Sequence, residues 1–211
     1  IMIRESSAAR NLAALLEAVD ADNFSRFFFA TDDRHPSDLL ARGHINWMLK
    51  EAVRLGTDPL AAIRLATINA AEAMGQRGIG AIAPGRRADL VILEDLVQFK
   101  PIQVYKDGVL VAEEGKALFP AQVEKNIPAR VARSVHIRSL GPEKFTLPPA
   151  GEYRVIQLVP GQIVTEEARA TQQETEALAE NDLVLLAVAE RHQGSGRVGL
   201  GLLRGLGLNR G

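Results

Sequence analysis

A run of ionisable and hydroxyl side chains follows directly after an apolar segment near the start of the chain. Residues 26–31 read RFFFAT and predict a strand that is buried on both faces, as in parallel sheets. The residues that follow are Asp32, Asp33, Arg34 and His35. Carboxylate, guanidinium and imidazole groups bind ions or exchange protons, and they are costly at the end of a buried strand unless they meet partners. The sequence therefore indicates a candidate functional site at this strand end.

The two adjacent aspartates cannot share one role. In an extended chain neighbouring side chains point to opposite faces, so only one of Asp32 and Asp33 would point into such a site. A turn carboxylate or a helix N-cap is the competing interpretation for Asp32. For the next residues, the competing interpretation is that Arg34 pairs with Asp33 and that His35 merely precedes Pro36.

The other candidate residues have plainer explanations. His44 and His136 are expected to be surface or hydrogen-bonded histidines, and His192 a loop histidine. Trp47 and Met48 are expected on the core face of a helix. The glycines of the tail are spaced as G-x-G-x-x-x-G, which differs from the dinucleotide-binding fingerprint. We expect those glycines to allow close packing of the backbone instead.

Composition restricts the class of protein. The chain has 211 residues, 46% hydrophobic and 24% charged, as in ordinary globular proteins. Its net charge of -1 gives no strong field for nucleic acid or acidic lipid. It has no cysteine, which excludes disulfides, thiolate zinc sites and a cysteine nucleophile. No apolar run reaches the roughly 18 residues of a membrane span, and the N-terminus lacks a signal-peptide layout. We therefore expect a cytoplasmic protein that binds neither nucleic acid nor membrane.

Helix and strand patterns alternate along the chain. Apolar spacing predicts helices over 7–19, 45–53 and 59–74, the last of which has Asp58 as its N-cap. Asp107-Gly108 between two apolar segments predicts a β-hairpin. The expected strands are 88–93, 102–105, 109–112, 134–140, 153–158, 163–165 and a buried strand over 182–189, with a loop or short helix over 172–181.

Three segments belong together: TDD at 31–33, TINAA at 67–71 and GIGAIAPGRRADLVIL at 78–93. In this order they resemble the end of an amidohydrolase-superfamily barrel and the small β-domain that follows it. Asp89, within the last segment, is expected to be structural. Four further segments are IRESSAARNL at 3–12, ATDDRHP at 30–36, AERH at 189–192 and GLGLLRGLGL at 199–208. These segments resemble the bacterial adenine deaminase family.

The resemblance implies an α/β plus β fold with three parts. Residues 1–75 would form the last strands and helices of an amidohydrolase (β/α)8 barrel. Residues 76–120 would form a segment of a small β-sandwich domain, and residues 121–211 an incomplete C-terminal α+β auxiliary domain.

The resemblance also implies a reaction, the hydrolytic deamination of adenine to hypoxanthine and ammonia by a metal-activated water. The cofactor would be a divalent metal, either manganese, iron or zinc. Asp32 would bind this metal and take a proton from the attacking water, with Asp33 as the alternative. Arg34 and His35 would lie at the substrate mouth, and Glu5 and Ser6 would approach the substrate from the preceding loop. A helix-capping role for Ser6 or Ser7 is the competing interpretation.

The histidine content departs from the family pattern. The family's metal site uses a His-x-His pair on the first strand, and no such pair exists here. The sequence reads as starting near the seventh strand. We therefore expect a fragment that is inactive alone and that supplies few of the ligands of the metal. Its expected partners are a purine substrate and either a homo-oligomer or the remainder of the same enzyme. Two alternatives stay open: an amidohydrolase acting on a cyclic amide or amino-acid derivative, or a non-catalytic β-rich module.

Overall fold

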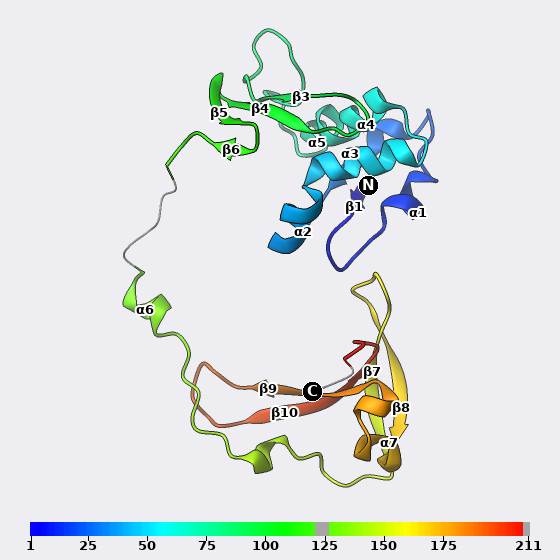
Figure 1. Ribbon diagram of the computed structural model, residues 1–211, viewed down its shortest axis with the longest axis vertical. Coiled ribbons are helices and arrows are strands. Elements are labelled where there is room, and N and C mark those ends of the chain that lie inside the picture. Colours follow the sequence, from blue (N-terminus) through cyan, green and yellow to red (C-terminus); the bar gives the residue numbers. More distant parts are fainter. Residues whose placement is uncertain (121–126, 209–211) are drawn as a thin grey trace. The chain divides into compact units, whose positions relative to one another are not determined.

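The computed structural model describes residues 1–120 and 127–208. The chain divides into two compact units, Ile1–Gln122 and Val123–Gly211, and each is described by itself (Figure 1). The first six residues of the connector that is expected from residue 121 lie outside the described residues. The last three residues of the glycine-rich tail lie outside them as well. Both units mix helices with strands, in agreement with the expected class. No helix in the described parts has the length and apolar character needed to cross a membrane.

The first unit begins with two short parallel strands. They are β1 (Met2–Arg4) and β2 (Phe28–Ala30), with Ile3 opposite Phe29 in the register. The three consecutive phenylalanines are at most 8% exposed. The expected strand over 26–31 is thus buried on both faces, but it is shorter than predicted. Its start differs because Phe24–Arg26 form a 3-10 turn, η1.

Five helices accompany this strand pair. Helix α3 lies where the sequence predicts it, and Asp58 caps α4 by accepting hydrogen bonds from the backbone N–H of Leu60 and Ala61. The helix expected over 7–19 is shorter, because residues 6–9 form a turn closed by Ser6. The helices are α1 (Leu12–Leu16), α2 (Pro36–Arg42), α3 (Ile45–Arg54), α4 (Pro59–Ala66) and α5 (Ile68–Ala73).

The long helix expected over 59–74 is divided at Thr67. The Thr67 hydroxyl donates to the carbonyl of Ile63 at 2.7 Å, and its backbone leaves the helical region at φ -127° and ψ -91°. Side-chain bonding to the preceding turn competes with the helix backbone for the same carbonyl groups. The result is that α4 ends at Ala66 and a separate helix, α5, begins at Ile68.

The core of the first unit joins the strand pair to the helices. Asn69 on α5 is 2% exposed, and its amide donates to the carbonyls of Phe24 and Phe27. Because a buried amide needs such partners, Asn69 fixes α5 against the start of β2. The buried apolar residues are Ile3, Leu12, Phe27, Phe29, Met48, Leu49, Ala52, Ala62, Leu65 and Phe99.

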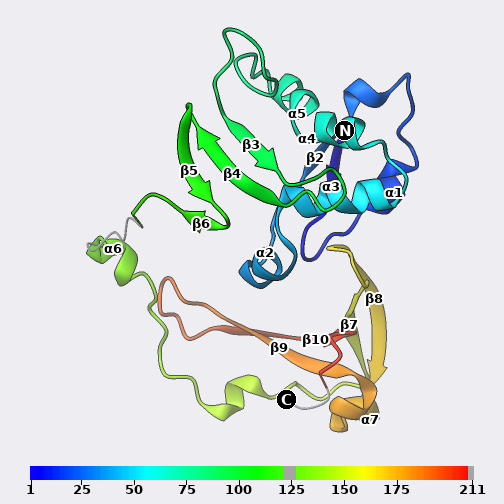
Figure 2. The ribbon, with the colours of Figure 1, turned by 45° about the horizontal axis from the view of Figure 1, so that its top comes forward.

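An antiparallel sheet completes the first unit. Figure 2 shows its four strands in the order β3 (Leu90–Leu93), β4 (Pro101–Lys106), β5 (Val109–Glu113) and β6 (Lys116–Ala117). The predicted hairpin is confirmed, and both of its central residues have positive φ, 51° at Asp107 and 78° at Gly108. This is the backbone that a two-residue hairpin turn with right-handed twist requires.

Asp89 stabilises this hairpin, which agrees with the structural role expected for it. Its carboxylate accepts hydrogen bonds from Lys106 Nζ at 2.7 Å and from the backbone N–H of Asp107 at 3.0 Å, and it pairs with Arg87. The Lys106 contact is the largest of the effects that hold the pKa of Asp89 well below its usual range. Asp89 is therefore structural.

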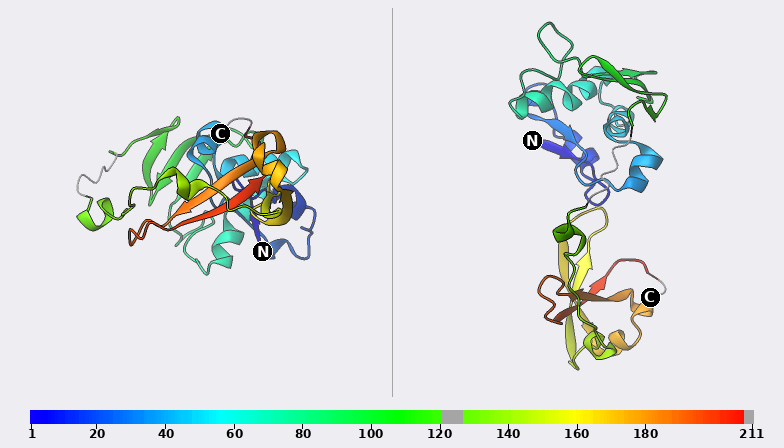
Figure 3. Two further views of the ribbon diagram at one scale, coloured as in Figure 1. Left: turned by 90° about the horizontal axis from the view of Figure 1, so that it is seen from below. Right: turned by 90° about the vertical axis from the view of Figure 1, so that its left-hand side faces the viewer.

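The second unit, which contains the yellow, orange and red strands of Figure 3, is built on a sheet. Its four strands lie in the order β8-β7-β10-β9. Strands β7 and β10 are parallel, and the two outer pairs are antiparallel. The buried apolar residues Val155, Ala170, Leu183 and Leu202 form its core. The strands are β7 (Glu152–Leu158), β8 (Thr165–Thr171), β9 (Leu183–Ala189) and β10 (Val198–Arg204).

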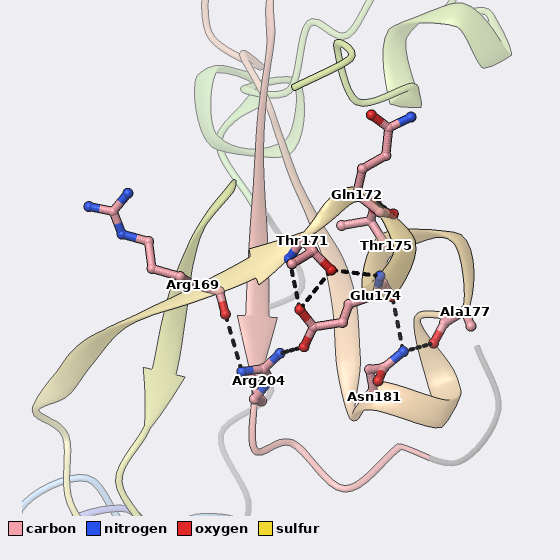
Figure 4. A network of polar contacts seen from close by, with 8 residues as sticks. All are labelled: Arg169, Thr171, Gln172, Glu174, Thr175, Ala177, Asn181 and Arg204. Atoms are coloured by element: carbon pink, nitrogen blue, oxygen red, sulfur yellow. Dashed lines mark hydrogen bonds and ion pairs between the residues drawn. The ribbon is translucent and has the colours of Figure 1, made fainter. Parts of the chain in front are cut away.

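A polar network holds the helix α7 (Gln172–Glu176) against this sheet. Thr171 and Glu174 form a capping box, and Arg204 on β10 pairs with Glu174 at 2.9 Å (Figure 4). Hydrogen bonds from Thr171, followed by the charge of Arg204, lower the pKa of Glu174. The remaining short elements of this unit are α6 (Ala129–Ala132), η2 (Pro142–Phe145) and η3 (Ala179–Asn181).

Several expectations for the second unit are wrong. Residues 134–140 form no strand, and the strand expected over 163–165 starts only at Thr165 and runs to Thr171. Strand β9 is not a buried strand, because Leu183 is buried but Val188 is 64% exposed. Strand β10 was not expected, since its glycines lower strand propensity.

Candidate functional site

The ends of β1 and β2 carry the six predicted site residues on two adjacent loops. Because the strands are parallel, both loops leave the same edge. The loops are joined by backbone hydrogen bonds from Glu5 N to Ala30 O at 3.1 Å and from Ser7 N to Asp33 O at 3.2 Å. The structure therefore brings together Glu5, Ser6, Asp32, Asp33, Arg34 and His35.

Asp32 has an unusual backbone and a charged partner. Its φ is 56°, in the left-handed region that non-glycine residues rarely adopt. Its Oδ2 lies 2.8 Å from Nη1 of Arg4, the last residue of β1, and the Asp32 side chain is 45% exposed. The carboxylate of Asp32 is thus accessible to solvent, and Arg4 of the neighbouring strand β1 holds it in place. Sequence reasoning missed Arg4, because nothing local in the sequence links it to Asp32.

Asp33 is also exposed but meets different groups. The Ser6 side chain is the largest of the effects that lower the pKa of Asp33, and a smaller effect comes from the charge of Arg4. The left-handed residue before it means that the two aspartates do not lie in one extended segment. The expected simple alternation of their side chains across the strand therefore does not apply.

Arg34 lies over an aromatic ring. The centre of its guanidinium group is 4.4 Å from the ring centroid of Trp47, a geometry in which the cation is attracted to the ring face. Its Nε and Nη1 atoms are buried and have no hydrogen-bond partner among the described residues. Burial lowers the pKa of Arg34. The alternative ion pair between Arg34 and Asp33 is absent from the ion pairs of the described residues.

His35 joins the site loop to helix α2. It occupies the N-cap position, and its backbone N–H donates to Ser7 Oγ at 2.8 Å. The Ser7 hydroxyl in turn donates to the carboxylate of Asp38 on the first turn of α2. Hydrogen bonding from Ser7 lowers the pKa of Asp38. Sequence reasoning weighed Ser7 only as a helix cap and did not consider Asp38.

Glu5 and Ser6 are buried and already hydrogen-bonded. Oε2 of Glu5 accepts from the backbone N–H of Leu12 at 2.9 Å, and Ser6 Oγ accepts from Ala9 N at 2.8 Å. The residue whose side chain reaches the start of α1 is therefore Glu5, whereas Ser6 closes the preceding turn. These contacts shape the loop that faces Asp33.

The described residues do not form a metal site by themselves. Within residues 1–120 and 127–208, no three histidine, cysteine, aspartate or glutamate side chains are grouped closely enough to hold a metal ion. The exposed carboxylates among the six site residues are Asp32, which is paired with Arg4, and Asp33, whereas the buried Glu5 accepts a hydrogen bond from Leu12 N. Two carboxylates with no third ligand of these types grouped beside them offer too few ligands for a tightly bound transition metal.

A pocket of the first unit lies away from these residues. Its volume is about 750 Å³, and its lining includes Leu16 of α1, Phe24 of η1 and Arg64 of α4. None of the six predicted site residues lines it. The cavity is therefore no part of the candidate site.

The histidines outside the site occupy hydrogen-bonded, surface or loop positions. His44 Nε2 lies 2.9 Å from Thr31 Oγ1, and Met48 is fully buried. The His136 backbone N–H donates to Arg191 O at 2.7 Å, although this segment is not a strand. The His192 backbone N–H donates to Glu190, which confirms a loop position.

Comparisons with known proteins agree on a family. The amidohydrolase family matches residues 1–111. The adenine deaminase of Petrotoga mobilis (strain DSM 10674 / SJ95) is 46% identical over 217 residues, covering 100% of this chain and 38% of that protein. Adenine deaminase 2 of Carboxydothermus hydrogenoformans is 46% identical over 216 residues, with the same two shares.

A solved structure also matches part of the chain. It is an amidohydrolase from Thermotoga maritima MSB8, with 29% identity, a TM-score of 0.34, and coverage of 41% of this chain and 23% of that chain. The chain spans about 38% of the length of the curated relatives that it matches.

Proposed function

Because the chain belongs to the amidohydrolase family, we propose that it is the C-terminal part of an adenine deaminase. The reaction is the hydrolysis of adenine to hypoxanthine and ammonia. The observation that carries this proposal is the similarity of the whole chain to proteins named adenine deaminase, at 46% identity in the first two. The loops that hold the candidate site lie within the residues matched by the family.

Asp32 is the proposed catalytic residue of this chain, with Asp33 as its alternative. Asp32 follows a buried strand whose carboxyl end shares an edge with β1, the place where barrel enzymes position catalytic groups. A divalent metal, when bound, supplies a water of lowered pKa. Manganese, iron and zinc are the candidates, and most of the ligands come from outside this chain, because the described residues offer no complete set.

The substrate contacts are proposed on the two joined loops. Arg34 and His35 follow the aspartates directly and are placed at the mouth of the site, where Trp47 holds the Arg34 guanidinium. Glu5 and Ser6 approach from the preceding loop, which is bonded to Ala30 and Asp33 by backbone contacts. A purine, planar and rich in hydrogen-bonding nitrogens, suits the exposed polar groups of Asp33 and His35, while Glu5 and Ser6 shape the preceding loop through their hydrogen bonds to Leu12 N and Ala9 N.

In the proposed architecture, β1 and β2 are the last two strands of a (β/α)8 barrel. Residues 1–75 belong to that barrel, residues 76–120 to a small β-domain and residues 121–211 to an auxiliary domain. The parallel pairing of β1 and β2 supports this arrangement. Two strands cannot close a barrel, so the remaining strands come from the rest of the enzyme, which is proposed to act in cytoplasmic purine salvage as a homo-oligomer.

A substrate panel on the full-length protein that carries this chain tests the proposal. We expect hypoxanthine and ammonia in equal amounts from adenine, and no turnover of a cyclic amide or an N-acyl amino acid. Turnover of either alternative substrate in place of adenine would replace this function by another amidohydrolase reaction. The third possibility, a non-catalytic module, predicts no turnover of any of them and no stoichiometric transition metal in the purified protein.

A further inference from the structure

The structure places an arginine opposite the proposed catalytic carboxylate. Arg4 ends β1, and its Nη1 reaches Oδ2 of Asp32 at 2.8 Å across the two strand ends. The register of the strands brings Arg4 opposite Ala30, two residues before Asp32. The pair is therefore fixed by the parallel pairing of β1 with β2.

The backbone around Asp32 needs external support. A left-handed conformation in a non-glycine residue persists only when its surroundings hold it, and such residues gather at functional sites. On one side Thr31 is buried and contacts His44. On the other side the carbonyl of Asp33 accepts from Ser7 N. Among the ion pairs of the described residues, Arg4 alone holds the side chain of Asp32 itself.

We propose that Arg4 is a positioning residue that orients the Asp32 carboxylate for the reaction. The catalytic meaning of this assignment rests on the proposed function. The two side chains are 30% and 45% exposed, and ion pairs this exposed contribute little to folding stability. The expected contribution of Arg4 is thus to the direction of the carboxylate and not to the stability of the unit.

Kinetics of the full-length protein test this role. Arg4→Gln removes the charge, and we expect kcat to fall by about 10²-fold with KM changed less than about twofold, because misplacement of a reacting group acts on the chemical step. Arg4→Lys should restore part of kcat. Arg54→Gln removes a matched surface pair, since Arg54 also lies 2.8 Å from its partner Glu51, and it should leave both constants unchanged.

Two kinetic results would overturn the assignment. One is a kcat for correctly folded Arg4→Gln protein equal to that of the unmodified protein. The other is a rise in KM with kcat unchanged, which would make Arg4 a substrate-binding residue. In an Asp32→Asn background, Arg4→Gln should cause no further loss if it acts through Asp32, and an additional loss would contradict that.

Hydrogen–deuterium exchange on the 211-residue chain tests the positioning without activity. We expect faster exchange in the peptide over residues 31–35 for Arg4→Gln, and unchanged exchange there for Arg54→Gln. Unchanged exchange in both variants would overturn the positioning role. Exchange over residues 31–35 could be faster in Arg4→Gln while the full-length protein does not deaminate adenine. In that case the proposed function fails, and the positioning of Asp32 by Arg4 stands.

Discussion

Oγ1 of Thr31 lies 2.9 Å from Nε2 of His44, so the residue before Asp32 is tied to the N-cap position of α3. Thr31 is only 7% exposed. Burial, followed by the charge of Arg34, lowers the pKa of His44. The contact therefore links the protonation of His44 to the backbone segment that carries Asp32.

The stability of the first unit is expected to depend on His44 below neutral pH. Since the folded pKa lies below the ordinary value of about 6.5, the unfolded state binds more protons as the pH falls. The contribution of neutral His44 to the stability of the first unit is fully present above about pH 6.5, and it is lost as the pH falls below that value. Melting temperatures between pH 7.5 and 5.5 should fall more steeply for the unmodified chain than for His44→Gln. His136→Gln, in the other unit, is the control, and equal slopes in the unmodified chain and His44→Gln would refute this.

Asn69 should be important for the stability of the first unit. Asn69→Ala leaves the carbonyls of Phe24 and Phe27 without their donor. Loss of such buried hydrogen bonds costs about 1–3 kcal/mol. Urea unfolding should show this loss, whereas Glu72→Ala, at an exposed position of the same helix α5, should change little. An Asn69→Ala chain as stable as the Glu72→Ala chain would contradict the assigned contact.

Two leucines of α4 provide a matched test of the core. Leu65 is fully buried and Leu60 is 62% exposed. Leu65→Ala should destabilise the unit by about 2–5 kcal/mol, because it removes buried methyl groups and leaves a cavity. Leu60→Ala should stay within about 0.5 kcal/mol. Equal losses in urea unfolding would mean that α4 presents a different face to the core.

In the second unit, Glu190 organises the loop between β9 and β10. Its carboxylate accepts from the backbone N–H of His192, Gln193 and Ser195, and these bonds lower the pKa of Glu190 to about 2. The stabilisation that the Glu190 carboxylate gives to this loop is fully present above the ordinary pKa of a glutamate. It is lost as the pH falls toward 2. Amide proton shifts of residues 192–195 should titrate with that midpoint and should not titrate in Glu190→Gln. A midpoint near the ordinary glutamate pKa would contradict the hydrogen bonding.

The elements that local sequence predicts well are those whose chemistry is local. Asp107-Gly108 meets the backbone requirement of its turn, and Asp58 caps α4 through residues two and three positions away. Helix α3 combines an apolar stripe with a stop at Gly56. In each case, the residues that decide the structure are neighbours in the sequence.

The elements that were missed depend on distant partners. Strand β10 carries Gly199 and Gly201, which disfavour a strand, yet pairing with β9 on one side and β7 on the other holds it in place. Apolar and polar residues alternate over 134–138 as in a strand, but this segment pairs with no strand of residues 1–120 and 127–208. Tertiary context overrides propensity in both cases.

The site was predicted as a group of residues but not as a set of contacts. The parallel strands bring the two loops together, as the resemblance implies, and the roles of Asp32 and its neighbours remain predictions. The pairs Arg4–Asp32 and Ser7–Asp38 join residues far apart in the sequence. No periodicity or motif indicates such pairs, because they follow from the register of β1 and β2.

The most direct test of the account is adenine turnover by the full-length protein with Asp32 changed. Asp32→Asn should reduce hypoxanthine formation by about 10²–10⁴-fold, as expected for loss of a group that moves a proton in the reaction, while circular dichroism stays unchanged. Asp22→Asn, an exposed aspartate outside the site, should retain full activity. Hypoxanthine formation by Asp32→Asn at the rate of the unmodified enzyme would contradict the central assignment.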